Sequence, residues 1–465
     1  MRKTKIICTI GPAVQGIDKL RGLVKAGMDV ARLNCSHGSH EEHALKIIDI
    51  KQIRREGNLP LPILIDLKGP EIRCHSFVGG KVELAEGQSF AIHSEPLLGD
   101  ASRMSVSYSD FHRDVNPGTP ILIDDGLIEL VVEEVRDRVV HTRVIVGGLL
   151  SDRKGVNLPN TPTQLPALSD SDYRDLQFAV EQEVEFVAAS FVRSAADVRE
   201  VRDALHELNG DSIRIIAKIE NQQGIDNIDE IIAAADGIMV ARGDLGVEIP
   251  PERVPVFQKK LIKQCYTSGK ISITATQMLD SMIKHTRPTR AEVSDVANAI
   301  YDGTSALMLS GETAVGKYPI QAVEMMDRIA RSTEQMIDYW DQLEALGSGC
   351  FGDVADAISH AAVTTARDLN ARAIIVMTYS GVTARMISRF RPASPILAMT
   401  ISPISRRQLA LSWGVSPYCV PLVSSTDAVF SQAMKVALSS GLVDSGDTVV
   451  LVGGSTSGTS GTTNT

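Results

Sequence analysis

The chain contains few cysteines, few aromatic residues and no long apolar run. Its 465 residues include 6 cysteines and 2 tryptophans, and aromatic residues make up 4% of the total. The cysteines are scattered without a C-x-x-C pair, which argues against a disulfide framework and a structural zinc site. No apolar run reaches the ~18 residues of a membrane span, and Gly-Pro follows MRKTKIICTI too soon for a signal-peptide core. We therefore expect a cytoplasmic protein with reduced cysteines and no membrane partner.

Clustered positive charge is also missing. The chain carries 47 Lys and Arg against 57 Asp and Glu, a net charge of −10, and has no block of five or more basic residues. A nucleic-acid partner is therefore not expected, and local geometry must hold any anionic ligand. The length and the 43% hydrophobic content predict a globular chain of two or three domains.

Eight short, β-branched apolar runs alternate with helical patterns. Such continuous hydrophobicity is typical of parallel strands buried on both faces. The sequences Ser39-x-x-Glu42, Asn227-x-x-Glu230 and Thr289-x-x-Glu292 predict capping boxes at helix starts. Eight strand–helix units in series predict an α/β fold of the (β/α)8 type, a TIM barrel. The runs are 6–10, 30–33, 63–67, 186–190, 214–219, 237–241, 271–276 and 305–310.

The spacing of these runs predicts the domain organisation. The third and fourth runs begin at Ile63 and Phe186, whereas the others begin roughly 22 to 35 residues apart. Residues 70–167 between them carry strand patterns and predict a small β-barrel lid domain at the catalytic mouth. The barrel then takes residues 1–69 and 168–335, and strand–helix alternation in 336–465 predicts a doubly wound α/β domain. The Gly/Ser/Thr-rich tail is typical of disorder, with a phosphate-binding loop as the alternative.

Polar residues follow the apolar runs, where barrel enzymes place reactive groups. Arg and Lys suit a carboxylate or phosphate ligand, and Glu220 and Asp244 offer the oxygen ligands that Mg²⁺ prefers. This mixture predicts metal-assisted phosphate chemistry, and the alternative for Glu220 and Asp244 is a pair of salt-bridged structural carboxylates. The residues are Arg32, Asn34, Ser36, His37, Asp66, Lys68, Glu71, Arg73, Lys218, Glu220, Arg242, Gly243, Asp244, Thr276, Gln277, Ser310 and Glu312.

Residues 311–318 match the spacing of a P-loop except at the last place. Tyr318 stands where a P-loop has the Ser or Thr hydroxyl that binds Mg²⁺, and Pro319 follows where the helix should be in its first turn. We interpret this stretch as a barrel loop that enters a helix at Pro319.

Several long motifs resemble the pyruvate kinase family and cover essentially the whole barrel in the family's order. They are KTKIICTIGPA, ARLNCSHGSHEEH, DLKGPEIR, IIAKIENQQGI, GIMVARGDLGVE and ATQMLDSMIKHTRPTRAEVSDVANAIYDGTSALMLSGETAVGKYP. The resemblance implies a glycolytic phosphotransferase that moves the phosphoryl group of phosphoenolpyruvate to ADP, giving pyruvate and ATP. It also implies a lid domain, a C-terminal effector domain and a homotetramer.

The resemblance assigns roles at the barrel mouth. Lys218 would contact the phosphoryl group in flight, and Arg32 would steady it. Glu220 and Asp244 would hold Mg²⁺ or Mn²⁺, while the backbone of residues 242–244, including Gly243, would receive the substrate carboxylate. Thr276 would deliver the proton to the enolate, in a relay with Ser310 and Glu312.

The resemblance further implies nucleotide, potassium and effector sites. Nucleotide contacts would come from Asn34, His37, Arg73 and Lys154, and K⁺ would bind Asn34, Ser36, Asp66 and the carbonyl of Leu67. Leu67 replaces the family's usual Thr, but Glu71 keeps the acidic residue that accompanies potassium dependence, so we expect K⁺ activation. A phosphorylated effector would bind Thr378, Ser380, Gly381 and Thr383, with loop 453–461 closing over it. An ordinary helix cap is the alternative for residues 378–383.

Two other functions are compatible with parts of the sequence. A lyase-type barrel enzyme acting on phosphoenolpyruvate or pyruvate would not need the lid or the pair Arg73 and Lys154. A sensor built on an inactive kinase barrel would not need the intact set of Lys218, Glu220, Asp244 and Thr276.

Overall fold

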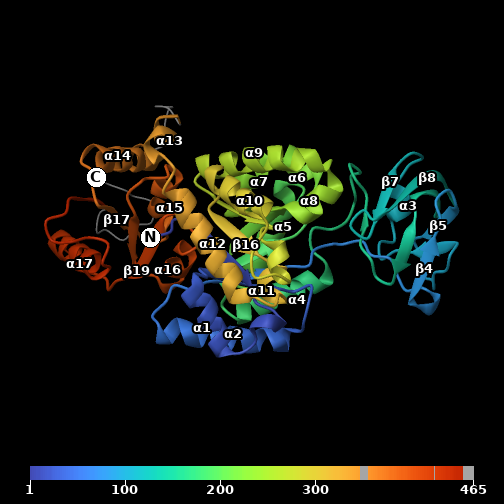
Figure 1. Cartoon of the computed structure of the whole chain (residues 1–465), viewed down its shortest axis with the longest axis horizontal. Coiled ribbons are helices and arrows are strands. Elements are labelled where there is room, and N and C mark those ends of the chain that lie inside the picture. Colours follow the sequence, from blue (N-terminus) through green and yellow to red (C-terminus); the bar gives the residue numbers. More distant parts are fainter. Residues whose placement is uncertain (346–353, 424, 454–465) are drawn as a thin grey trace.

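The computed structural model describes residues 1–345, 354–423 and 425–453. Eight parallel strands close into a barrel in the order β1-β16-β15-β14-β13-β12-β3-β2. This confirms the predicted TIM barrel, which occupies the middle of the molecule in Figure 1. The strands are β1 (Lys5–Thr9), β2 (Val30–Asn34), β3 (Ile63–Asp66), β12 (Phe186–Ala189), β13 (Arg214–Ile219), β14 (Gly237–Ala241), β15 (Ile271–Ala275) and β16 (Ala306–Leu309).

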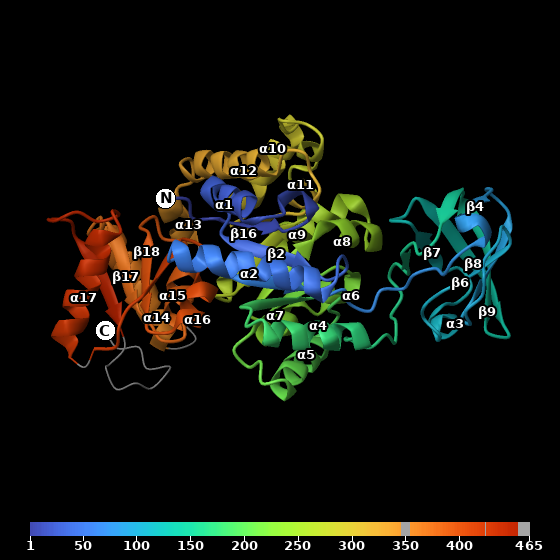
Figure 2. The same ribbon diagram turned by 90° about the horizontal axis from the view of Figure 1, so that it is seen from below.

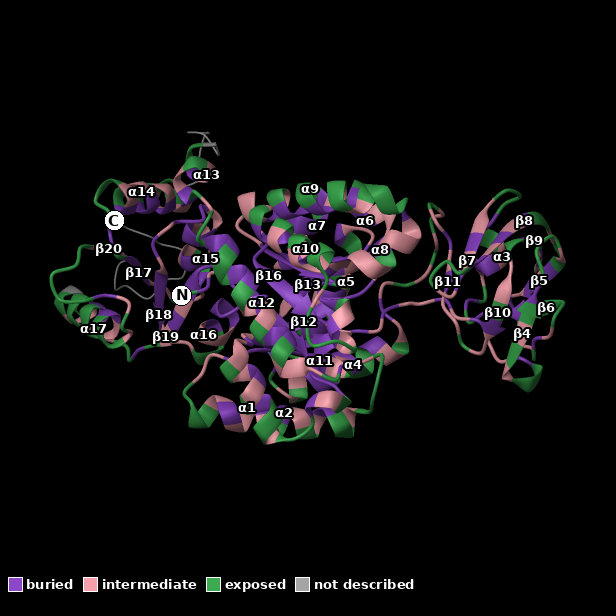
Figure 3. Ribbon diagram, in the orientation of Figure 1, coloured by how far each residue is buried: buried purple, intermediate pink, exposed green. Residues whose placement is uncertain are grey.

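The barrel strands are buried on both faces, which explains their continuous apolar runs. Ile7, Leu64 and Phe186 belong to the cluster that fills the barrel, whereas Ile6 and Ile63 pack outward against the helices. Figure 3 shows the strands as a buried centre inside a ring of partly exposed helices. Successive residues of one strand therefore serve two separate cores.

The ring consists of longer helices and several short turns. Among the described residues no helix is both long and apolar enough to cross a membrane. The helices are α1 (Ile17–Ala26), α2 (His40–Glu56), α4 (Asp170–Glu181), α5 (Ala195–Glu207), α6 (Gln222–Asp226), α7 (Ile228–Ala234), α8 (Arg242–Glu248), α9 (Val254–Thr267), α10 (Arg290–Tyr301), α11 (Gly311–Ala314) and α12 (Pro319–Glu334), with single 3-10 turns at η1 (Pro12–Val14), η3 (Pro251–Arg253) and η4 (Asp280–Ile283).

Two of the three predicted capping boxes are confirmed, at Ser39 and Thr289. The prediction at Asn227 is wrong. Asn227 ends α6 as well as preceding α7, and its side chain donates to the carbonyl of Arg193, while Glu230 accepts from the N–H of Ala195. The tertiary contacts of Asn227 and Glu230 replace the local cap.

The inserted segment forms a six-stranded sheet, β11-β7-β8-β9-β5-β6, and a two-stranded sheet, β10-β4, around a core of its own. Figures 1 and 2 both place these strands at one end of the barrel, opposite the C-terminal sheet. The exact division at residues 70 and 167 stays a prediction. The elements are η2 (Val78–Gly80), β4 (Lys81–Leu84), β5 (Ser89–His93), β6 (Arg103–Ser105), α3 (Phe111–Asp114), β7 (Pro120–Ile123), β8 (Ile128–Arg136), β9 (Val139–Val146), β10 (Gly148–Ser151) and β11 (Val156–Asn157).

The C-terminal part is an open parallel sheet in the order β19-β18-β17-β20, with helices on both faces. This confirms the predicted doubly wound fold, and the strand order reverses between β17 and β20. The boundary at 335/336 stays a prediction, and residues 454–465, with most of the predicted closing loop, lie outside the described residues. The elements are α13 (Tyr339–Ala345), α14 (Val354–Asp368), β17 (Ala373–Met377), α15 (Val382–Arg389), β18 (Ile396–Thr400), α16 (Pro403–Leu409), β19 (Val415–Cys419), α17 (Thr426–Ser439) and β20 (Val449–Gly453).

One buried carboxylate binds both segments that connect the barrel to the inserted strands. The N–H of Gly69 donates to Asp172 Oδ1 at 2.9 Å, and the N–H of Ser169 donates to Asp172 Oδ2 at 2.8 Å. Gly69 has φ +75°, and a Cβ on it would lie 2.6 Å from Ser190 Cβ. The crossing from β3 into the insertion therefore requires glycine.

We expect Gly69→Ala to lower the free energy of unfolding by about 2–4 kcal/mol, because left-handed strain adds to the clash with Ser190. Gly79→Ala is the matched control. Gly79 has φ +74° but open space around it, so this variant should lose only about 1 kcal/mol. Urea unfolding midpoints measure both variants. Equal losses would contradict the crowding at Ser190.

Candidate active site

A chain of buried charges crosses the carboxyl ends of β2, β3 and β13. Arg32 Nε lies 2.7 Å from Asp66 Oδ2, and Lys218 Nζ lies 3.4 Å from Asp66 Oδ1 and 2.8 Å from Glu220 Oε1. The side chains of Asp66 and Glu220 are at most 1% exposed. The four residues that the sequence predicted from three different strands therefore form one network.

Lys218 keeps its proton in this network. Burial disfavours the ammonium, but the carboxylates of Asp66, Glu220 and Asp244 outweigh burial and raise the pKa of Lys218 above its ordinary value. Arg32 and Lys218 in turn outweigh burial at Asp66 and lower the pKa of its carboxyl. The mouth of the barrel thus presents two fixed positive charges.

Glu220 and Asp244 fit a divalent cation. Burial, together with the nearby Asp244, raises the pKa of Glu220 to about 7 against the opposing effect of Lys218. Glu220 Oε2 accepts from the N–H of Phe191, and Oε1 lies 2.8 Å from Lys218 Nζ. No group of three or more His, Cys, Asp or Glu suited to a metal occurs within the described residues. Two carboxylates would leave the other positions of a bound divalent cation to further oxygen ligands.

The predicted potassium ligands gather at the ends of β2 and β3. Asn34 pairs with Asp66 in the parallel register of these strands, and its side-chain oxygen accepts from the N–H of Ser36. Asp66 Oδ1 is buried and lies 3.4 Å from Lys218 Nζ. The carbonyl of Leu67 accepts from Ser190 Oγ at 2.7 Å and keeps a second lone pair. These oxygens fit a monovalent cation.

Thr276 lies against the backbone of Gly243. A Cβ on Gly243 would lie 2.9 Å from the Thr276 methyl and 3.8 Å from its hydroxyl, so this contact needs glycine. Thr276 has φ +75°, an unusual conformation for a β-branched residue. The Arg242 guanidinium stabilises it, because Nε donates to the carbonyl of Ala275 at 3.1 Å and Nη2 donates to that of Thr276 at 2.7 Å. The sequence suggested Arg242 as a cation available to an anionic substrate. In the structure its guanidinium is occupied by these two carbonyls.

The loops after β15 and β16 are joined by Glu312. Its carboxylate accepts from the N–H of Leu279 at 2.9 Å and from that of Ser310 at 2.8 Å, and burial raises its pKa. Both oxygens of Glu312 are therefore occupied, and Glu312 holds the loop that carries Ser310. The P-loop look-alike forms the short α11 and enters α12 at Pro319.

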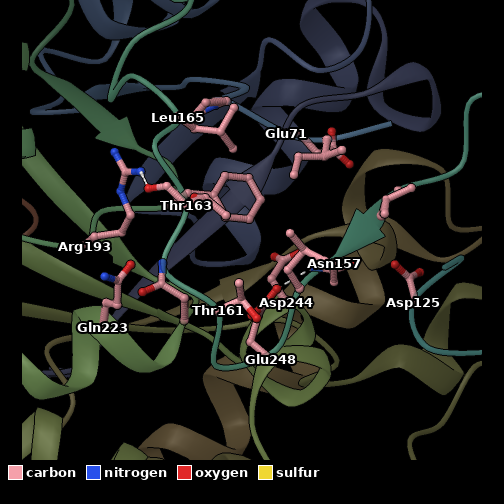
Figure 4. A pocket seen from close by; sticks show the side chains of 17 residues that line it. Glu71, Asp125, Asn157, Thr161, Thr163, Leu165, Arg193, Gln223, Asp244 and Glu248 are labelled. Carbon is pink, nitrogen blue, oxygen red and sulfur yellow. Dashed lines mark hydrogen bonds between the residues drawn. The ribbon is translucent and has the colours of Figure 1, made fainter. Parts of the chain in front are cut away.

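Of the four predicted nucleotide contacts, Asn34 lies beside Asp66 of the charge network, whereas Arg73 and Lys154 lie on the inserted segment. Arg73 Nη2 lies 2.7 Å from Glu71, and Lys154 Nζ lies 2.8 Å from Asp124, so both cations have carboxylate partners near the inserted strands. His37 lies in the exposed loop before α2. A cavity of about 100 Å³ lies between the insertion and the barrel, and Asp244 is among the residues that line it. Figure 4 shows it with Glu71 and Asp125 on the insertion side and Asp244 and Glu248 on the barrel side.

The predicted effector residues lie where β17 ends, next to the reversal of strand order in the C-terminal sheet. Thr378 Oγ1 accepts from the N–H of Gly381, which has φ +81° and begins α15. Arg385 Nη2 donates to the carbonyl of Ser380 at 3.3 Å. Ligands of open α/β sheets bind at such a reversal.

Two residues of the network were missed at the sequence level. Thr9 Oγ1 accepts from Arg32 Nη1 at 2.8 Å, and Ser190 Oγ accepts from Lys218 Nζ at 2.7 Å. Thr9 lies one residue before the end of the first apolar run, and Ser190 is the last residue of the fourth. A rule that takes only the polar residues that follow a run passes over both.

The chain is similar to several known proteins. It matches the family models "Pyruvate kinase, barrel domain" over residues 1–323 and "Pyruvate kinase, alpha/beta domain" over residues 356–465. The pyruvate kinase of Sporosarcina psychrophila is 50% identical, over 100% of this chain and 80% of that protein. That of Clostridium acetobutylicum is 48% identical, over 100% and 98%. A crystal structure of a pyruvate kinase from Cryptosporidium parvum superimposes with a TM-score of 0.94 and 42% identity, covering 98% of this chain and 94% of that one.

We expect Asp66→Asn to lower the free energy of unfolding by about 3–5 kcal/mol, because it leaves Arg32 and Lys218 buried without their shared counter-charge. Asp18→Asn is the control. It breaks a pair with Arg21 in which Asp18 is 92% exposed, and should change stability by at most about 1 kcal/mol. Urea titration measures both variants, and a small loss in Asp66→Asn would contradict the buried network.

Proposed function

The chain belongs to the pyruvate kinase family, and from that premise we propose that it transfers the phosphoryl group of phosphoenolpyruvate to ADP, with Mg²⁺ and K⁺ and under the control of a phosphorylated effector. Its class is therefore that of a phosphotransferase. The observation that carries the proposal is the buried network of Arg32, Asp66, Lys218 and Glu220 at the barrel mouth. This network offers fixed cations beside a carboxylate that fits a metal.

Lys218 and Arg32 would stabilise the phosphoryl group during transfer. A loose transition state spreads negative charge over the phosphoryl oxygens, and preorganised cations lower its energy. The raised pKa of Lys218 keeps the ammonium charged, and Asp66 orients both cations. Mg²⁺ on Glu220 and Asp244 would supply a Lewis acid for the enolate oxygen. Mn²⁺ suits the same oxygen ligands.

Thr276 would deliver the proton that converts the enolate to pyruvate, through a water molecule. The Arg242 contacts with the carbonyls of residues 275 and 276 hold the Thr276 hydroxyl beside Gly243. The backbone of Gly243 and Asp244 would receive the substrate carboxylate, so the hydroxyl and the substrate would meet at one point. Ser310 would complete the proton relay.

The inserted domain would act as a lid over the nucleotide. Its cations Arg73 and Lys154 have carboxylate partners in Glu71 and Asp124. ADP phosphates would compete for these cations as the lid closes, while Asn34 and His37 would contact the nucleotide from the barrel side.

The effector site and the oligomer are the regulatory part of the proposal. Residues 378–383 offer hydroxyls and backbone N–H groups for a phosphate at the start of α15. Phe430, Met434 and Leu438 form an exposed apolar stripe along α17, with 48%, 37% and 46% of their surface accessible. Such a stripe supports contact between subunits and the expected homotetramer. Free thiols at all five described cysteines support a cytoplasmic location.

We expect Lys218→Met to lower kcat at least 100-fold while changing phosphoenolpyruvate binding much less, because the ammonium acts on charge that develops during transfer. Pyruvate release in a coupled assay measures kcat, and ligand titration measures binding. Lys51→Met, in an exposed pair with Glu183, is the control and should keep full activity. Pyruvate release that continues without ADP would overturn the kinase proposal, because water would then be the acceptor of the phosphoryl group.

Potassium should raise the rate several-fold. With tetramethylammonium as the replacement cation at constant ionic strength, we expect kcat to fall, because Asp66 Oδ1 and the Leu67 carbonyl lose their cation. Equal rates in the two buffers would refute the potassium site. The same titration with Na⁺ tests selectivity.

A further inference from the structure

A small cavity lies between the base of the barrel and α15, at the end opposite the catalytic mouth. It is lined by Tyr266 at the end of α9, by Lys270 and Ser305 just before β15 and β16, and by residues 385–391 and 412–413 of the C-terminal part. Its free volume is about 10 Å³, which is enough for one water molecule or one small ion. Residues 378–383 do not line this cavity.

Arg391 is the most buried cation of the cavity, with 5% of its surface exposed. Its Nη2 donates to the carbonyl of Gly303 at 2.8 Å and to Ser305 Oγ at 3.1 Å. The guanidinium lies over the rings of Trp413 and Tyr266, 4.7 and 5.4 Å from their centroids. No carboxylate in the described part of the chain pairs with Arg391, and its Nε has no hydrogen-bond partner. A buried charge in this position needs a counter-charge.

The surroundings add more positive charge than the protein neutralises. Lys270, Arg385 and Arg389 also line the cavity, which gives it four cations with Arg391. Across residues 1–345, 354–423 and 425–453, the one carboxylate within ion-pair distance of these four cations is Asp356, paired with Arg389. The nearby Asp236 already pairs with Arg202 and Arg214. Four cations thus line the cavity in a chain whose net charge is −10.

Burial lowers the pKa of Arg385 to about 9, with Arg214 adding to the effect and Asp236 opposing it. Burial also lowers the pKa of Lys270, whose Nζ donates to the carbonyl of Ala235 at 2.6 Å. Both directions follow mainly from burial, which makes it costly to keep these cations charged without a counter-charge.

A second buried donor lines the same cavity. Ser412 is 2% exposed, and its hydroxyl has no hydrogen-bond partner. Ser412 and Arg391 therefore both line the cavity, and each carries a buried polar atom without a hydrogen-bond partner. A water molecule would satisfy their hydrogen bonds but would leave the charge uncompensated.

We propose that this cavity binds one small inorganic anion, of the size of chloride, through Arg391 and Ser412. The anion would neutralise buried charge from the barrel base and from the C-terminal part at once, and would thereby stabilise the contact between them. The site lies at the opposite end of the barrel from the catalytic mouth, and it adjoins the effector loop through Arg385, which donates to the carbonyl of Ser380.

Bromide is the probe for the direct test, because it resembles chloride and scatters anomalously. Crystals of the full-length protein grown without halide and soaked in sodium bromide should give an anomalous peak in the cavity, within about 3.5 Å of Arg391 Nε and Ser412 Oγ. A cavity that holds only water, without anomalous signal, would overturn the proposal.

Solution measurements provide the second test. After exchange into sodium gluconate, replacing gluconate by bromide at constant ionic strength should raise the unfolding midpoint of the wild type by about 2 °C. Ser412→Ala should lose at least half of this shift. Ser359→Ala is the matched control, because Ser359 is equally buried and unpartnered but does not line the cavity, and it should keep the full shift. An equal shift in both variants, or none in the wild type, would contradict the anion site.

Discussion

The arrangement of the catalytic mouth depends on Asp66. This one carboxylate, almost completely buried, is shared by two cations, with Arg32 at one oxygen and Lys218 at the other. Its place at the end of β3 is fixed by pairing with β2 on one side and β12 on the other. Barrel closure and charge placement are therefore one constraint, because a shift in register would remove Asp66 from between Arg32 and Lys218.

The barrel and the C-terminal sheet could be predicted because burial on both faces leaves a continuous apolar run that needs no knowledge of neighbours. The mouth residues could be predicted because strand ends are visible as the last polar residues after each run. Thr9 and Ser190 were overlooked because they lie inside their runs, at or next to the last residue, rather than after them.

Other features could not be read from the sequence because they depend on contacts between distant residues. Asn227 has the local pattern of a helix cap, but its side chain donates to the carbonyl of Arg193 instead. Arg242 stands among mouth residues, yet its guanidinium turns back to the carbonyls of residues 275 and 276. The cation-rich cavity at the barrel base is lined by residues as far apart in the sequence as Tyr266 and Trp413, so no short motif indicates it. Direction of a side chain, unlike its position, is set by the packed structure.

The insertion between β3 and β12 also has a consequence for folding. These strands pair directly in the finished barrel, although the whole lid separates them along the chain. The lid has a hydrophobic core of its own, and a lid that collapses first brings its two ends together and replaces a long flexible loop with a short one. The entropy of the long connection is then lost when the inserted segment folds, and little more is lost when β3 and β12 pair. Synthesis order favours this sequence of events, since the lid leaves the ribosome before β12 does.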